Sequence, residues 1–340
     1  MKHSAIPWAL TVIMGLYVYG LTFYAQNRVP PEPSYDFYDT TCVSVQIHDP
    51  ESLHDVYGRF NNILEGHYEL IKARVEQKQY KLVFQVNSPR PAMLYIDDKA
   101  LEIFLVPGDT SLKIDVHVNP VTYQFDSLIF HGKTKNICQY YLDKAVRFDQ
   151  VHIRSKRGII VSEDFESYVS KLDSMAAREL AFLAEREIFS TLPDWFARFE
   201  KNEILYQKAY LKLSAAYNQD ISPKLLDHIA IDNQGAVFSY YYYLYLKTYL
   251  AHQLQDQIDL SPGGDSLQLL KFTKAQLQVA DSLLSGVPHD VFLTRSIFHQ
   301  MTQGRTEIAE ELLAQYESTF HQQKYVRFLH NQLTLHLQGI

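Results

Sequence analysis

Histidine and carboxylate side chains are the first groups in this sequence whose chemistry could support a metal site. There are 14 histidines among 340 residues, but no two of them stand three or four positions apart. That spacing is what lets two imidazoles on one helix share an ion. His48 and His54, with Asp49 and Asp55 beside them, come nearest to a cluster, and we expect a solvated loop there. The sequence therefore predicts no metal site, and it contains no glycine-rich phosphate loop that would indicate another cofactor.

A serine in the segment GGDSL, residues 263–267, imitates the nucleophile block of the GDSL esterases. In those enzymes the serine follows a strand, and a later Asp-x-x-His supplies the acid and the base. Here Ser266 follows a loop between expected helices, and the only Asp-x-x-His, Asp149 to His152, precedes it. Asp265 or Ser266 is better explained as a helix N-cap that accepts a backbone N–H. We therefore expect no catalytic residue and no enzymatic activity.

Two cysteines, Cys42 and Cys138, are the only thiols, and 96 positions separate them. This separation excludes a Cys-x-x-Cys redox pair and a thiolate zinc site. In an oxidising compartment they could form a disulfide worth up to about 4 to 5 kcal/mol of stability. Two separate thiols in packed elements are the favoured interpretation, and the pairing stays open.

An aromatic run, FSYYYYLYLKTYL at residues 238–250, could stack against a flat ligand. On a helix Phe238, Tyr245 and one of the tyrosines between them fall on one stripe that packs in the core. Tyr240 and Tyr243 then point elsewhere, where their rings could stack against a glycan or a peptide. Packing between helices is the favoured interpretation, because an aromatic stripe at helical spacing needs no ligand to explain it.

The bulk composition limits the class of protein. Because 46% of the residues are hydrophobic and 21% are charged, the chain can bury a large core and divide into two folded units. The formal net charge of −7 leaves no basic field to neutralise phosphates. Nucleic acid is therefore not an expected partner.

The first 39 residues are typical of a membrane anchor followed by a spacer. Residues 5–25 carry no formal charge and are long enough to form a helix that spans a bilayer. An uncleaved transmembrane signal anchor is favoured over a cleaved signal peptide, because the apolar run is long and the small-residue cleavage pattern is poor. Residues 1–4 then lie in the cytoplasm, and residues 26–39 form a proline-rich linker. We expect a single-pass inner-membrane protein whose body lies in the periplasm.

The rest of the chain has two different periodicities. Residues 40–131 alternate with a period of two, which predicts seven or eight short strands in an antiparallel β-sandwich-like domain. Within it Pro107, Gly108 and Asp109 form a structural turn that reverses the chain and lets two apolar strands pair. Residues 132–340 change to a helical period and predict about eight helices, stacked as hairpins in the manner of tetratricopeptide units. The predicted fold class is α+β.

Residues 67–116 resemble the N-terminal β-domain of the TlpA/ResA-like thiol-disulfide oxidoreductases of the Bacteroidota. The strand that ends in LVPGD and the segment FHGKTKNICQYYLDK, residues 130–144, carry the likeness. The resemblance implies an envelope location and a sheet domain followed by a helical domain. Members with this layout continue into a thioredoxin domain with a Cys-x-x-Cys, which residues 1–340 do not contain. It therefore implies no redox activity and no catalytic residue.

These observations together predict a non-enzymatic, membrane-anchored envelope protein that acts as a binding or scaffold module. We expect its partner to be an envelope protein or peptide. The alternative is an accessory component of a periplasmic thiol-disulfide redox system, whose thioredoxin module is on another chain or has been lost.

Overall fold

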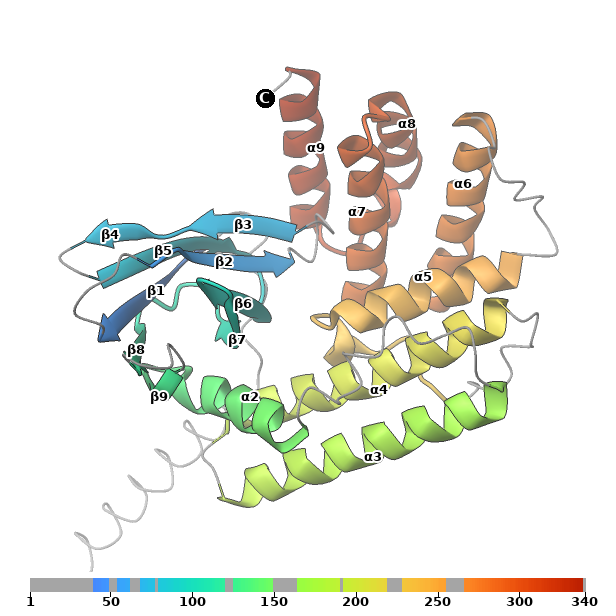
Figure 1. Ribbon diagram of the computed structural model, residues 1–340. Coiled ribbons are helices and arrows are strands. Elements are labelled where there is room, and N and C mark those ends of the chain that lie inside the picture. The colour runs from blue at the N-terminus through green and yellow to red at the C-terminus, as the bar shows by residue number, and fades with distance from the viewer. Residues whose placement is uncertain are drawn as a thin grey trace, which may run out of the picture.

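The computed structural model describes residues 39–48, 54–61, 68–76, 79–119, 125–148, 164–189, 192–218, 228–254 and 266–338. These residues form two β-sheets, followed by eight α-helices (Figure 1). The predicted α+β class and the order of the two regions are confirmed. The predicted anchor at residues 5–25 lies outside the described residues. Within the described ranges, no helix has the length and apolar character that a membrane span requires.

Nine strands make up the two sheets within the described ranges. They are β1 (Asp39–His48), β2 (Val56–Asn61), β3 (Tyr68–Lys72), β4 (Arg74–Glu76), β5 (Gln79–Val86), β6 (Arg90–Ile96), β7 (Lys99–Leu105), β8 (Leu112–Val118) and β9 (Phe125–His131). The larger sheet has the strand order β4-β5-β1-β8-β9, and the smaller has the order β3-β2-β6-β7. In β6 every second residue is buried, so the alternation in the sequence does select the face that packs in the core.

The larger sheet is mixed, which corrects the expectation of a purely antiparallel domain. β1 pairs with β8 in the parallel direction, from Val43 opposite Leu112 to His48 opposite His117. The other pairs of described strands are antiparallel. Parallel neighbours need a long connection, and here the chain passes through β2 to β7 between β1 and β8.

The two sheets share one hydrophobic core. Phe60 of β2 meets Phe84 of β5 edge to face, with ring centroids 5.6 Å apart. Gly58 lies directly over the same Phe84 ring, since a Cβ built there would be 2.4 Å from the Phe84 Cζ atom. β7 and β9 are edge strands of different sheets, and both contact the helix α2 (Lys135–Phe148). This helix therefore joins the sheet region to the helices that follow.

The turn at Pro107, Gly108 and Asp109 carries the chain from one sheet to the other. The Asp109 N–H donates to the Val106 carbonyl at 3.0 Å, and Gly108 has a φ of +74°. With proline before this glycine, the geometry is that of a type II turn. The positive φ agrees with the sequence expectation, but the flanking strands do not pair, because β7 pairs with β6 and β8 pairs with β1 and β9. The turn is a crossover between sheets and not the tip of a hairpin.

Asp109 holds this crossover in place from inside the fold. The residue is 4% exposed. Its Oδ1 atom accepts from the Ser111 N–H at 2.9 Å and from the Ser111 hydroxyl at 2.6 Å. Its Oδ2 atom accepts from the Thr134 hydroxyl at 3.4 Å. Asp109 therefore ties the turn to the start of α2, and its side chain is not presented to a partner.

We expect Asp109→Ala to lower the free energy of unfolding by about 1 to 3 kcal/mol, because the buried Thr134 hydroxyl and two Ser111 donors lose their acceptor. Urea denaturation of the full chain measures the change. Asp98→Ala is the matched control, since the Asp98 side chain is 88% exposed and pairs only at the surface with Lys99. Equal stability of both variants would mean that the Asp109 contacts contribute nothing.

The helices of the second region pack against one another mainly in chain order. They are α3 (Phe165–Phe189), α4 (Asp194–Asn218), α5 (Tyr240–Leu254), α6 (Ser266–Leu283), α7 (Gly286–Thr302), α8 (Thr306–Tyr316) and α9 (Gln323–Leu337), with short 3-10 turns η3 (Gln234–Ala236) and η4 (Glu317–Thr319). Figure 1 shows α3, α4 and α5 stacked on one another, and α6 to α9 standing across them. Asp164 accepts from the Ser167 N–H at 3.1 Å and caps the start of α3.

A buried ionic cluster joins α2, α3 and α4. The Lys144 ammonium lies 2.8 Å from Glu179 Oε2 and 2.6 Å from Glu200 Oε1. The Tyr141 hydroxyl donates to Glu200 Oε2 at 2.9 Å, and the Tyr140 hydroxyl donates to Oε1 at 3.3 Å. Lys144 is 6% exposed and both glutamates are fully buried. One ammonium therefore faces two carboxylates, and their attraction fixes the three helices relative to one another.

Candidate functional site

A pocket of about 340 Å³ opens where the sheet region meets the helices, and we name it the junction pocket. Its walls come from the loop between β5 and β6, from the first half of α4 and from the segment around η3. Sites between domains are common places for ligands to bind. The lining residues are Pro89, Trp195, Arg198, Phe199, Lys201, Asn202, Asn233, Gly235 and Phe238.

Aromatic rings form the apolar part of the junction pocket. Trp195 and Phe199 both contact Phe104 of β7, with ring centroids 6.0 Å and 5.4 Å apart. Phe104 is fully buried, so it anchors both rings to the core. Phe238, just before α5, is partly buried and adds a third ring. The pocket therefore has a well-supported aromatic wall that suits a flat or apolar group.

Two cations stand at the junction pocket. Arg198 and Lys201 are exposed, and no carboxylate of the described residues forms an ion pair with either of them. Asn202 donates to the Gly235 carbonyl at 2.7 Å, and the Asn233 side chain accepts from the Gly235 N–H at 3.0 Å, which fixes the opposite wall. The described lining holds no carboxylate, imidazole, thiol or hydroxyl side chain. Its chemistry is therefore that of binding an anionic group beside an apolar one.

A second groove, of about 430 Å³, lies between β9, α2 and α3. One of its two cations, Arg186, is paired with Asp143 at 3.0 Å and lies 5.2 Å from the Phe182 ring centroid. These contacts engage Arg186 within the protein itself, whereas Arg147, the other cation of the lining, is exposed. Asp126, Asp143 and Glu185 also line the groove, so it is less suited than the junction pocket to bind an anionic group.

Tyr240 and Tyr243, the predicted stacking residues, face a side chain of the protein itself. The Arg295 guanidinium lies 3.7 Å from the Tyr243 ring centroid and 5.2 Å from the Tyr240 ring centroid. Arg295 is 4% exposed and Tyr243 is 8% exposed. Burial lowers the pKa of the Arg295 guanidinium, and the two tyrosines oppose that shift. Arg295 thus covers the buried Tyr243 ring, while Tyr240 is half-buried, and stacking of a glycan or peptide on these rings stays a prediction.

The two cysteines are free thiols in different elements. Cys42 lies on β1 opposite Val83, and its N–H donates to the Asp109 carbonyl. Cys138 lies on α2 and is fully buried, and burial raises the pKa of its thiol to about 12. A thiol with so high a pKa is almost entirely protonated at neutral pH and is a poor nucleophile.

The other sequence candidates do not converge on one site. His48 lies 3.7 Å from Asp115, whereas His54 contacts Asp97 at 2.7 Å. The two histidines therefore have different carboxylate partners and do not form one cluster. Ser266 is the first residue of α6, and Asp149, His152, Asp49 and Asp265 lie outside the described residues.

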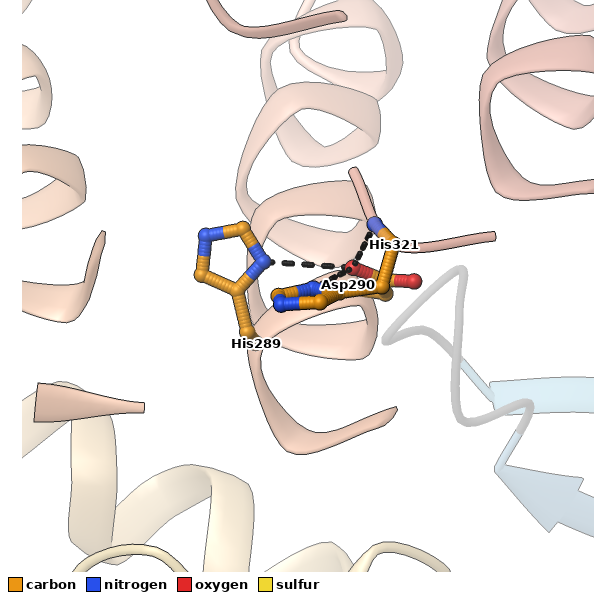
Figure 2. A group of neighbouring side chains, drawn as sticks. All are labelled: His289, Asp290 and His321. Carbon is orange, nitrogen blue, oxygen red and sulfur yellow. Dashed lines mark hydrogen bonds and ion pairs between the residues drawn. The ribbon is translucent and has the colours of Figure 1, made fainter. Parts of the chain in front are cut away.

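Sequence reasoning missed one group of neighbouring side chains, which Figure 2 shows at the start of α7. Asp290 Oδ1 lies 3.2 Å from His289 Nδ1 and 3.0 Å from His321 Nδ1. The His289 Nε2 atom contacts Asp281 Oδ1 at 3.0 Å. Burial opposes protonation of His289, but its contacts with Asp290 and Asp281 outweigh burial and raise its pKa. Only the packing of α7 near the start of α9 brings His321 to this pair, so no sequence spacing could have revealed it.

Comparison of the sequence with models of known protein families and with curated proteins found no match. The likeness of residues 67–116 to TlpA/ResA-like proteins therefore remains a hypothesis.

Proposed function

We propose that this protein is a membrane-anchored binding module of the bacterial envelope. The uncharged run at residues 5–25 supports the anchor, because its length suffices to span a bilayer. The likeness of residues 67–116 to an envelope β-domain supports a periplasmic location for the body. In this proposal the two sheets form a sandwich, the helices stack as hairpins in the tetratricopeptide manner, and both regions act as a non-enzymatic scaffold.

The junction pocket is the feature of the structure that best supports the proposed binding role. It places three aromatic rings beside Arg198 and Lys201 in a chain whose net charge is −7. A partner polypeptide with an acidic residue next to an apolar or aromatic residue matches both features. The carboxylate would pair with the cations, while the apolar side chain would contact Trp195 and Phe238.

The alternative role is that of an accessory component in a periplasmic thiol-disulfide redox system. The chain has no Cys-x-x-Cys, and burial raises the pKa of the Cys138 thiol to about 12. In this alternative the redox chemistry belongs to a thioredoxin module on another chain. The junction pocket would then be the place where that module binds.

Site-specific photo-crosslinking tests the proposed binding role. Benzoylphenylalanine replaces Lys201 in the full chain, which is expressed in its own host and irradiated. We expect one dominant adduct, which is lost when Arg198→Glu is added. We expect Trp195→Ala to weaken binding of the partner in that adduct by about 2 kcal/mol, or about 30-fold in Kd, because central aromatic residues act as hot spots.

Arg178 is the matched control position for the crosslinker. It is an exposed arginine on α3 that does not line the junction pocket. The binding role is wrong if Lys201 gives no adduct, if Arg178 gives the same adduct, or if Arg198→Glu leaves the yield unchanged. Thermal melting of Arg198→Glu separates loss of binding from loss of folding, and we expect its Tm to equal that of the wild type.

A further inference from the structure

The donor atoms of His289, Asp290 and His321 have the spacing of metal ligands. One ligand atom from each lies within 4.8 Å of the other two. Asp290 Oδ1 is 3.2 Å and 3.0 Å from the two Nδ1 atoms. Zinc bonds of about 2.0 to 2.1 Å at tetrahedral angles separate neighbouring ligand atoms by about 3.3 Å. Small shifts of the two rings seen in Figure 2 would therefore accommodate the ion.

Hydrogen bonding alone leaves Asp290 Oδ1 crowded with donors. Both Nδ1 atoms point at this oxygen, and the His321 backbone N–H also donates to it at 2.9 Å. A carboxylate oxygen has about two lone-pair sites. With an ion present, the imidazole nitrogens become ligands and Oδ1 keeps one lone pair for the metal and one for the N–H. In the metal-bound arrangement each lone pair of Asp290 Oδ1 therefore has one partner, and no donor is left in excess.

The surroundings of the three residues resemble the outer shell of a metal site. His289 Nε2 contacts Asp281 Oδ1 at 3.0 Å, so with an ion bound the neutral ring would keep its proton on Nε2 and offer the Nδ1 lone pair to the ion. A carboxylate in that position is the usual orienter of a zinc-bound histidine. The Gln322 N–H donates to Asp290 Oδ2 at 2.9 Å, so the second oxygen is held as well.

The site is open to solvent on one side. His289 and Asp290 are 1% and 0% exposed, while the His321 side chain is 48% exposed. An ion can therefore reach buried ligands through the His321 side. Two imidazoles with one carboxylate suit zinc, whereas Mg²⁺ and Ca²⁺ prefer oxygen ligands. Three protein ligands leave the fourth position of a tetrahedral ion to water or to a side chain of a partner.

We propose that His289, Asp290 and His321 form a zinc site that ties the start of α7 to the start of α9. Zinc that binds the folded chain also stabilises it by mass action. The site lies apart from the junction pocket, since the two share no residue. It would therefore bind zinc whether or not the proposed binding role holds.

Calorimetric titration of the purified, chelator-treated full chain with zinc chloride tests this proposal. We expect one equivalent of Zn²⁺ to bind and Mg²⁺ not to bind, and we expect Co²⁺ to give the visible absorption of a tetrahedral site. His321→Ala should remove this binding, and Asp281→Asn should weaken it by about 10- to 100-fold, as the loss of an orienting partner does. His330→Ala is the matched control, because its side chain is 54% exposed on α9 and pairs with Glu317 instead.

Three results would each overturn the zinc site. They are no zinc binding by the wild type, equal binding by the wild type and His321→Ala, and an equal loss in His321→Ala and His330→Ala. Because His321 is half-exposed, its variant is expected to fold, and circular dichroism checks this. If His321→Ala does not fold, Asp281→Asn takes over as the test, and an unchanged zinc affinity in that variant would contradict the proposal.

Discussion

Lys144→Met is expected to lower the free energy of unfolding by about 3 to 5 kcal/mol. Methionine keeps most of the side-chain volume but removes the ammonium that lies 2.8 Å and 2.6 Å from the buried Glu179 and Glu200. Two carboxylates would then face each other in a site that excludes water. Urea denaturation of the full chain, followed by circular dichroism, measures the change.

Lys208→Met is the matched control for this prediction. Lys208 pairs with Asp173 at 3.1 Å, but the Asp173 side chain is 48% exposed and also contacts Lys212 at 2.8 Å. We expect Lys208→Met to cost no more than about 1 kcal/mol, as for other solvent-exposed pairs. Adding Glu200→Gln to Lys144→Met should recover part of the loss, because it removes one uncompensated charge. A double variant as unstable as the single one would point to lost packing and not to electrostatics.

The sheet region shows that local periodicity predicts strands but not the way in which they pair. Alternation predicted seven or eight strands in residues 40–131, and the described residues there form nine, because burial of every second residue leaves a direct signal in the sequence. The parallel pairing of β1 with β8 left no such signal, since Val43 and Leu112 are far apart in the chain. The turn at Gly108 shows the same limit. Its positive φ follows from local chemistry, but which strands pair around it depends on the whole fold.

The helical region shows why candidate sites are harder to predict than elements. Helical periodicity indicated that part of the tyrosine run is core, and Tyr245 is indeed fully buried. It could not indicate that Arg295, from another helix, would cover Tyr243. The junction pocket also arises from contacts between distant segments, because Pro89 and Trp195 come together only when the sheet region packs on α4. Contacts between distant segments create these sites, and a single sequence carries no direct record of them.

Gly132→Ala is expected to lower the free energy of unfolding by about 2 to 5 kcal/mol, from backbone strain and overpacking together. Gly132 connects β9 to α2 and has a φ of +98°, which L-residues rarely adopt. A Cβ at this position would lie 2.3 Å from the Ser111 carbonyl oxygen. That oxygen belongs to backbone that Asp109 already holds, so it cannot move away cheaply. Thermal melting and urea denaturation of the full chain measure the loss.

Gly108→Ala isolates the backbone part of this effect. Gly108 also has a positive φ, of 74°, but a Cβ built there meets nothing within 4 Å. We therefore expect a loss of only about 1 kcal/mol, from the left-handed conformation alone. The difference between the two variants measures how tightly the start of α2 packs on the crossover turn. If both glycine variants lose the same stability, the contact with Ser111 relaxes without cost, and the fit of α2 against the turn does not determine how the helices join the sheets.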